Sequence, residues 1–444
     1  MNMFLKVMLS FVLCHLFGVL ASSAEIPNHH IFYRQDKRAP LTSIEIVFLG
    51  AGKNQEQPSQ IGLANTVSAL IGEAAKKQGY LDQLSALGAN LDIITHPLYQ
   101  AISISALSEN CGESIKMVFD FMRNLEFSNS DLQYAKKQEA TDYQSGLRIN
   151  TYTFMRTYAL SQITGKKQFK SLKALKNFSL EDVRQYYDQL LKADVVFFKI
   201  ISNRDSTEVA KLLHPVTKER ETGGFVHSPK FSITDYNVGF KAFVYTDYSH
   251  LKSVFCHWMI LCGGSVGEEN YIPNLISNTL TGDERGLISK YFREELGLVY
   301  GPSCAMLSSG GIRYLNIYAD PQLHNSEELI VKMSDFIRGL SDNPRFWEAL
   351  KERRKILKVS PAHNLTPQRS LDREVNIAIY NAPYRKGGYD SVTDDEVRAF
   401  LEEFFVPENM IMIFVGPKDH IIDILNKHLP EVDIRVHDVK ELIE

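Results

Sequence analysis

The hydrophobic positions of this chain follow two periods, one typical of strands and one typical of helices. In Gln100–Leu107, isoleucine and alanine alternate with serine, so one face of the predicted strand is apolar and the other is polar. Around Ile115–Met122 the apolar residues instead recur at helical spacing. The predicted strands are Ser43–Leu49, Leu91–Thr95, Gln100–Leu107, Val195–Ile201 and Val254–Leu261. The predicted helices are Gly62–Lys77, Leu81–Leu87, Asp131–Thr164, Ser179–Leu191 and one that begins near Tyr271.

The order of these elements occurs twice along the chain. A strand, a glycine turn and a helix open each unit, and a helix-capping sequence, at Ser179 and again at Thr393, precedes the last helix and strand. The matched positions are Gly50 with Gly263, at an offset of 213, and Val183 with Val397, at an offset of 214. We therefore predict an α+β fold of two homologous halves, each an antiparallel β-sheet with helices packed on one face.

Length and composition also indicate a globular protein with more than one compact unit. The chain has 444 residues, of which 44% are hydrophobic and 23% are charged. Residues 214–233 are rich in Pro, Gly, Ser, Thr and charge without periodicity, which is typical of a linker. We predict an N-terminal half over 25–213, this linker, and a C-terminal half over 234–444. The formal net charge of −4, with no basic cluster, argues against nucleic acid as a partner.

Residues 1–24 have the organisation of a secretory signal peptide. Lys6 precedes the apolar run Val7–Leu20, and small residues follow up to Ala24, after which we predict cleavage. The apolar run is short for a membrane span, and Cys14 lacks the small residues that precede a lipid-modified cysteine. We expect an exported chain without a membrane anchor after cleavage. We assign it to the periplasm, because an organellar presequence would contain more Arg and Ser.

The cysteines of the mature chain indicate neither a disulfide framework nor a zinc site. They are dispersed along the chain, and Cys256 and Cys262 lie in an apolar strand-like run, so we expect buried free thiols. The four cysteines are Cys111, Cys256, Cys262 and Cys304. The sequence has no Cys-x-x-Cys pair with matching His residues, and no G-x-S-x-G or cysteine-centred catalytic signature. We predict no metal site in this chain.

The segment Gly286–Ser303 predicts a sharp corner between a helix and a strand. Its apolar residues fall on one helical face, and Gly297 stands where a left-handed residue would end the helix. Arg293 lies one turn before this break, and Tyr300 falls at the third position of the predicted strand. A guanidinium and a phenol held at such a corner could bind a carbonyl or a developing oxyanion. A plainer interpretation is a helix C-terminus with an Arg that interacts favourably with the helix dipole.

Two duplicated halves, an exported chain and this corner together resemble the M16 (pitrilysin-like) metallopeptidases. The resemblance covers essentially the whole mature chain, and its most specific parts are 87–92 (LGANLD) and 293–300 (REELGLVY). It implies the fold shared by M16 peptidases and LuxS-type metallohydrolases. In that family an Arg and a Tyr seven residues apart in the C-terminal half reach the substrate carbonyl. Arg293 and Tyr300 match both identity and spacing, so the resemblance implies that they bind the substrate carbonyl and its oxyanion.

The zinc-binding signature of the family is absent from this sequence. Asn65, Ser68 and Ala69 stand where a catalytic M16 half carries His, Glu and His. None of the three can replace an imidazole ligand or a general base. The third ligand of the family would fall within 139–146, where Glu139 and Asp142 are available. A lone carboxylate there is more typical of an exposed helix residue than of a metal ligand.

The family includes two-chain enzymes in which one chain holds zinc and the other carries the Arg/Tyr pair. By this resemblance we expect a non-catalytic, substrate-binding subunit that acts on peptides. Its heterodimer partner would be a zinc-bearing M16 homologue, with zinc in the partner and no cofactor in this chain. The alternative is a catalytically inert M16-like scaffold, or a peptide-binding or assembly protein. A self-sufficient protease would instead hold zinc in the single chain.

Overall fold

The computed structural model describes most of the chain, and all structural statements below refer to the described residues. These are 30–53, 56, 60–96, 98–149, 151–164, 175, 177–192, 196–217, 238–246, 252–262, 271–281, 286–309, 312–364, 366–380 and 388–438. The predicted signal peptide lies outside them, as do residues 218–233 of the predicted linker and the predicted turn at Gly263. Residues 214–217 form the end of helix α9 (Ser206–Thr217).

The N-terminal half is built on a five-stranded sheet with the strand order β1-β5-β2-β4-β3. Its strands are β1 (His30–Gln35), β2 (Leu41–Leu49), β3 (Ala89–Thr95), β4 (Tyr99–Leu107) and β5 (Val196–Ser202). Neighbouring strands are antiparallel, except that β1 runs parallel to β5. In β2, Ile44, Ile46 and Phe48 point to the helix-covered face, as the alternating hydrophobic pattern predicts.

The C-terminal half repeats this sheet and adds one strand, in the order β11-β6-β10-β7-β9-β8. Its strands are β6 (Lys241–Thr246), β7 (Phe255–Cys262), β8 (Ser303–Ser309), β9 (Ile312–Ala319), β10 (Met410–Val415) and β11 (Asp433–Asp438). Strand β6 runs parallel to β10, as β1 runs parallel to β5, and β11 extends the sheet beside β6. The prediction of two related α+β halves is therefore confirmed. The sheets are not purely antiparallel as predicted, because the N-terminal sheet has one parallel strand pair and the C-terminal sheet has two.

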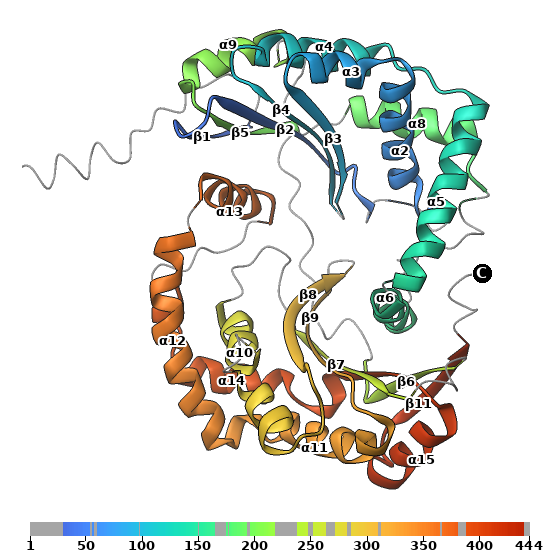
Figure 1. The fold of residues 1–444 in the computed structure, drawn as a ribbon, viewed down its shortest axis with the longest axis vertical. Coiled ribbons are helices and arrows are strands. Elements are labelled where there is room, and N and C mark those ends of the chain that lie inside the picture. Colours follow the sequence, from blue (N-terminus) through green and yellow to red (C-terminus); the bar gives the residue numbers. More distant parts are fainter. Residues whose placement is uncertain are drawn as a thin grey trace, which may run out of the picture.

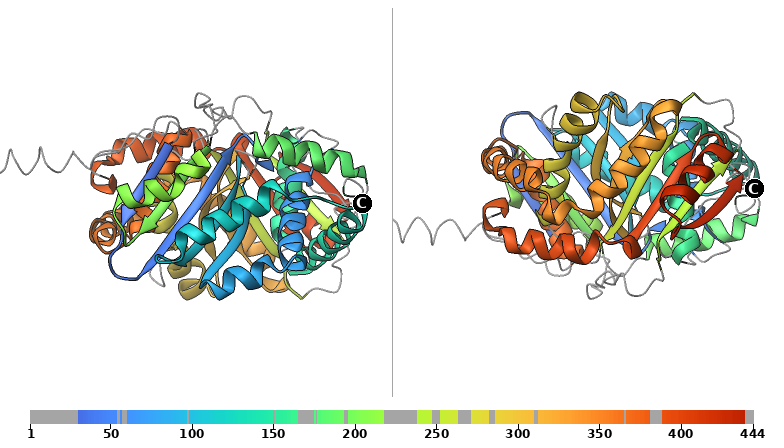
Figure 2. Two further views of the ribbon diagram at one scale, coloured as in Figure 1. Left: turned by 90° about the horizontal axis from the view of Figure 1, so that it is seen from above. Right: turned by 90° about the horizontal axis from the view of Figure 1, so that it is seen from below.

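Most helices cover the outer faces of the two sheets (Figures 1 and 2). Those of the N-terminal half are α2 (Leu63–Lys77), α3 (Tyr80–Ala86), α4 (Cys111–Arg123), α5 (Asn129–Ile149), α8 (Leu180–Leu191) and α9. Those of the C-terminal half are α10 (Tyr271–Thr281), η3 (Ser289–Glu295), α11 (Ser326–Arg338), α12 (Pro344–Asn364), α14 (Asp394–Phe404) and α15 (Lys418–His428). Short 3-10 turns are η4 (Leu323–Asn325), η5 (Leu340–Asp342), η6 (Gly388–Ser391) and η7 (Pro407–Asn409). None of the described helices is both long and apolar enough to cross a membrane.

Helix α6 (Thr151–Thr164) leaves its own half and packs on the inner face of the C-terminal sheet (Figure 1). Met155 and Ala159 are fully buried against a cluster that includes Tyr245 and Met259. The Tyr245 hydroxyl also donates a hydrogen bond to the Met155 carbonyl, at 3.1 Å. The predicted helix Asp131–Thr164 is therefore two helices, because its second part packs against the other half.

Helix α13 (Pro367–Tyr380) makes the reciprocal contact and lies on the inner face of the N-terminal sheet, over β1 and β5. Its contact combines ion pairs with an apolar cluster in which Val375 packs against Val47 and Phe197. Asp372 accepts a hydrogen bond from the Lys199 ammonium at 2.8 Å, and Lys199 also pairs with Glu45 of β2 at 2.6 Å. Arg34 of β1 pairs with Glu374. The two halves are thus joined by a mainly apolar contact of α6 and by a contact of α13 that is both apolar and ionic.

Local predictions from the sequence hold at several positions. Ser179 and Thr393 both form complete capping boxes, in which each hydroxyl accepts from the third helical N–H and the acidic side chain there accepts from the cap N–H. The four cysteines are all free and buried, as expected. Burial raises the pKa of the Cys262 thiol to about 12, so that thiol is unreactive at neutral pH.

Candidate functional site

The predicted corner is formed by a π-helix rather than by an α-helix. Residues Ser289–Glu295 form η3, and the Leu296 N–H donates to the Tyr291 carbonyl, five residues back, at 3.1 Å. Phe292 anchors this turn, because its side chain is completely buried in the core of the C-terminal half. Gly297 has a φ of +64° and ends the turn in the left-handed conformation, as predicted. Such π turns are rare and are frequent at functional sites.

The predicted start of the following strand is wrong. Strand β8 begins at Ser303, so Tyr300 lies in an irregular segment between η3 and the strand. The reason is local, because Pro302 has no N–H to donate to a neighbouring strand, and pairing starts directly after it. Released from the sheet, the Tyr300 side chain is 81% exposed, the most exposed of the large hydrophobic side chains in the described part of the chain.

Arg293 and Tyr300, predicted as a pair, do lie together. The guanidinium carbon of Arg293 lies 4.7 Å from the centroid of the Tyr300 ring, which is a cation–π contact. Both side chains are exposed, and neither donates a hydrogen bond to another described residue. The guanidinium N–H groups and the phenolic O–H are therefore available to an acceptor from outside the described structure. Two such donors side by side could bind one carbonyl oxygen or an oxyanion.

The positions of the lost zinc motif lie on α2 and are occupied by a hydrogen-bond network. The Ser68 hydroxyl lies 2.7 Å from the Thr95 hydroxyl and accepts from the Gln100 amide at 3.2 Å. Gln100 also donates to the Ala64 carbonyl at 2.7 Å. Asn65 and Ala69, on the same helix, supply no imidazole. Amide and hydroxyl groups that bind one another do not fit a zinc ion, which requires imidazole, thiolate or carboxylate ligands.

The remaining candidate ligands do not complete such a site. Asp142 lies exposed on α5, where its carboxylate accepts from the Gln138 amide at 3.2 Å. Glu139, on the same helix, is half-buried. Among the described residues, no group of three His, Cys, Asp or Glu side chains could hold a metal ion. This part of the chain therefore gives no support to a zinc site of its own.

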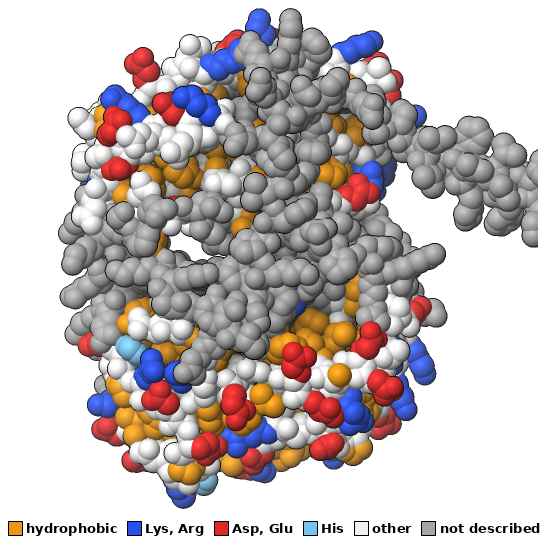
Figure 3. Space-filling view, turned by 180° about the vertical axis from the view of Figure 1, so that it is seen from behind, with side chains coloured by type: hydrophobic (Ala, Val, Ile, Leu, Met, Phe, Trp, Pro, Cys, Tyr) orange, Lys and Arg blue, Asp and Glu red, His pale blue; other side chains and the backbone are white. Residues whose placement is uncertain are grey.

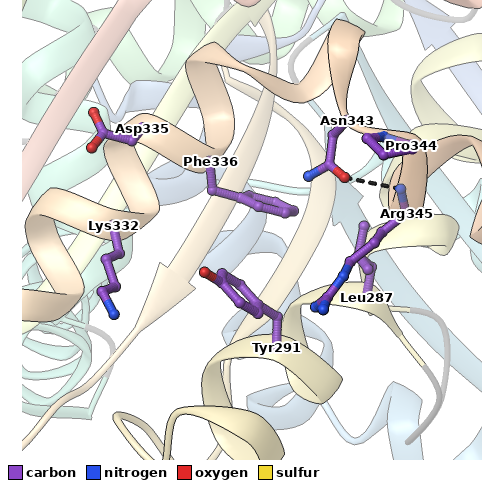
Figure 4. A pocket seen from close by; sticks show the side chains of 8 residues that line it. All are labelled: Leu287, Tyr291, Lys332, Asp335, Phe336, Asn343, Pro344 and Arg345. Atoms are coloured by element: carbon purple, nitrogen blue, oxygen red, sulfur yellow. Dashed lines mark hydrogen bonds between the residues drawn. The ribbon is translucent and has the colours of Figure 1, made fainter.

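A cavity lies beside η3 and is lined in part by Tyr291 (Figure 4). It has a volume of about 510 Å³ and lies between η3, α11 and the start of α12. Tyr291 forms part of its wall and stacks on Phe336 of α11, with the ring centroids 6.1 Å apart. Arg345 reaches over the Tyr291 ring from α12. Sequence reasoning did not single out Arg345, because the contact joins residues more than fifty positions apart.

Charges on the surface give no sign of a nucleic-acid site. On the face shown in Figure 3, Lys and Arg side chains of the C-terminal half alternate with Asp and Glu side chains. Among the described residues, charges are also paired between helices, such as Lys427 of α15 with Glu327 of α11 at 2.7 Å. A phosphate backbone requires clustered positive charge, which this face lacks.

The two homologous halves, the α2 positions without zinc ligands and the exposed Arg/Tyr pair together fit the M16 resemblance. Residues 177–355 match the family model described as "Peptidase M16 inactive domain". These residues, less than half of the chain, are therefore similar to an M16 inactive domain, in line with the sequence resemblance. A search of curated protein sequences found no match.

Solved structures show the same fold over nearly the whole chain. A peptidase M16 inactive domain from Pseudomonas fluorescens aligns with a TM-score of 0.72 and 14% identity, covering 88% of this chain and 96% of that one. The periplasmic protease PqqL from Escherichia coli aligns with a TM-score of 0.67 and 9% identity, covering 89% of this chain and 48% of PqqL. A chain of complex III2 from Candida albicans, with Inz-5 bound, aligns with a TM-score of 0.65 and 12% identity, covering 91% of this chain and 97% of that one. At these identities the likeness concerns the fold alone.

Proposed function

We propose that this protein is the non-catalytic, substrate-binding subunit of a two-chain M16-type zinc peptidase. Arg293 and Tyr300 would donate hydrogen bonds to the carbonyl of a peptide substrate and to the oxyanion that forms from it. The partner would be a zinc-bearing M16 homologue, and the zinc would supply activated water. This chain would hold no cofactor of its own.

The exposed Arg/Tyr pair is the observation that supports this proposal most strongly. A pair that served only to stabilise the fold would be expected to use its donors internally, whereas the donors of Arg293 and Tyr300 meet no acceptor among the described residues. Tyr300 is also an unusually exposed aromatic side chain. Exposed aromatic and Arg side chains are typical of binding surfaces.

The compartment forms part of the same proposal. The predicted signal peptide supports export, and one protein of the same fold is described as periplasmic. We therefore place the two-chain peptidase in the periplasm, where it would act on peptides and not on nucleic acid. The mature chain would carry no membrane anchor.

An inert scaffold is the second candidate. The likeness to a chain of complex III2 supports it, because that protein of the same fold belongs to a large assembly. A scaffold has no use for hydrogen-bond donors aimed at a scissile carbonyl. The two functions therefore differ in whether Arg293 and Tyr300 affect peptide turnover.

The test uses the chain purified from its native cells together with whatever it binds, assayed on a mixture of quenched fluorescent peptides. Arg293→Ala or Tyr300→Phe should lower kcat about 100-fold, because removing one oxyanion donor costs about 3 kcal/mol. Both variants should still bind the partner. Arg398→Ala is the matched control, because Arg398 is an exposed arginine that also lies over an aromatic ring, that of Trp347, at 4.6 Å. Equal turnover in all four proteins would exclude the proposed role and leave the scaffold.

A further inference from the structure

The backbone of η3 places Arg293, and η3 is not a self-sufficient element. It has only seven residues, and its π hydrogen bonds link each N–H to the fifth carbonyl back, a pattern that seldom persists beyond one turn. A short π turn that keeps its form needs support from the surrounding structure. Phe292 supplies support from the core side. The solvent-facing side of η3 needs a contact from another element.

Arg345 contacts both ends of the π turn. Its guanidinium donates to the Glu295 carboxylate at 2.8 Å, and its Cζ lies 5.6 Å from the centroid of the Tyr291 ring. Tyr291 and Glu295 lie about one turn apart in η3, so Arg345 bridges the turn along one side. Arg293 lies midway between them in the sequence of the turn, and its guanidinium contacts the Tyr300 ring. One side chain from α12 therefore contacts two residues of the turn that carries Arg293, and Figure 4 shows its approach to Tyr291.

Arg345 is itself held firmly. Its backbone N–H donates to the Asn343 side-chain oxygen at 3.0 Å, as in an N-terminal helix cap (Figure 4). The next residue, Phe346, is completely buried in the core of the C-terminal half. The guanidinium therefore extends from a fixed point, and its planar fork is well suited to binding a carboxylate and a ring at once.

Helix electrostatics does not explain either charge of this pair. Arg345 lies in the first turn of α12, where the helix dipole disfavours a cation, and Glu295 is the last residue of η3, where it disfavours an anion. The pair is also half-exposed, with side-chain exposures of 58% and 49%, so its contribution to global stability is at most about 1 kcal/mol. Both residues have an unfavourable interaction with their own helix dipole, and the contact that they make joins α12 to η3.

We infer that Arg345 is a positioning residue, which holds the π turn of η3 so that Arg293 and Tyr300 face the substrate carbonyl. This inference rests on the proposed function for its kinetic consequence, but its structural consequence is independent of that function. Without Arg345, the solvent side of the turn is no longer spanned, and Arg293 loses its fixed distance to Tyr300. A displacement of about 1 Å in a positioning group can cost about 100-fold in rate.

The kinetic test compares variants in the purified two-chain complex, with the same quenched fluorescent peptides. Arg345→Gln and Glu295→Gln should each lower kcat about tenfold or more, with little change in KM or in melting temperature. Arg345→Lys should restore part of the loss, because it keeps the charge but not the planar fork. Arg338→Gln is the matched control, because Arg338 also joins a carboxylate, Glu431 at 2.9 Å, to a ring, Phe240 at 5.0 Å, but does not contact η3. It should leave kcat unchanged.

A double-mutant cycle shows whether Arg345 acts through Arg293. In an Arg293→Ala background, Arg345→Gln should cause no further loss of kcat. If Arg293→Ala lowers turnover but Arg345→Gln leaves it unchanged, or if the two losses simply add, the inference is overturned. If Arg293→Ala itself has no effect, the proposed function fails, and a crystal structure of the Arg345→Gln chain decides the inference. An unchanged π turn and an unchanged Arg293–Tyr300 contact in that crystal structure would overturn it, whereas loss of either supports it.

Discussion

The buried histidine of strand β7 predicts that this protein loses stability in mild acid. His257 is only 2% exposed and lies on the inner face of the C-terminal sheet, where α6 packs. Its Nδ1 lies 3.1 Å from the Asn316 side-chain oxygen, and its ring packs against Tyr318. Burial, together with the nearby charge of Arg156 on α6, lowers the pKa of His257 to about 3. The folded protein therefore keeps this imidazole neutral.

The sign and size of the effect follow from linkage between protonation and folding. Below pH 6.5 the unfolded chain takes up a proton at His257, while the folded chain does not until about pH 3. The contribution of the neutral His257 to the free energy of unfolding is therefore complete above pH 6.5. It falls as the pH falls toward 3. Over the whole window, the loss from this residue is about 5 kcal/mol, and between pH 7.5 and pH 5 it is about 2 kcal/mol.

Urea unfolding at pH 7.5 and pH 5, monitored by tryptophan fluorescence, measures the loss in free energy of unfolding between the two pH values. We expect the wild type to lose about 2 kcal/mol more than His257→Gln over this interval, because glutamine has no proton to gain. Comparing each protein with itself at two pH values removes the cost of the substitution at pH 7.5. Equal losses in the two proteins would refute the reasoning, because they would show that His257 does not titrate differently in the folded and unfolded states.

Two further predictions concern the contacts that join and cap the elements. Asp372→Asn should weaken the ionic contact of α13 and lower the free energy of unfolding by only about 1 kcal/mol, because Lys199 keeps its bond to Glu45. Urea unfolding at low salt measures this free energy, and an unchanged midpoint would contradict the prediction. Ser179→Ala and Thr393→Ala should each cost about 1 kcal/mol, because each removes the side-chain acceptor of a capping box. Thermal unfolding measures the stability of both variants. A loss of stability in only one of them would contradict the equivalence of the two caps.

The sequence predicted those features that depend on neighbouring residues. Hydrophobic periodicity located β2 to β5 of the N-terminal sheet and β7 of the C-terminal sheet. The capping boxes at Ser179 and Thr393 formed as predicted because a cap needs only residues three apart. The duplication was visible because both halves retain the same order of elements. The spacing of Arg293 and Tyr300 also placed them at one corner, and the structure brings them together.

The features that the sequence did not reveal depend on contacts between distant segments. The sequence predicted a helix through 151–164 but not the surface against which it packs, so the contact of α6 with the other half was not predicted. The strand expected at Tyr300 failed because the lack of an N–H at Pro302 outweighed the apolar pattern. Arg345 was missed for a similar reason, because a charged residue in a first helical turn has no pattern that shows its partner.

In the proposed two-chain peptidase, this chain supplies the substrate-binding donors and a partner supplies the zinc. The most direct test is to measure zinc content and peptide cleavage for the chain alone and for the chain with its co-purified partner. We predict no bound zinc and no cleavage for the isolated chain, and cleavage by the complex that falls about 100-fold in Arg293→Ala. One tightly bound zinc ion per isolated chain, with peptide cleavage in the absence of any partner, would contradict the account.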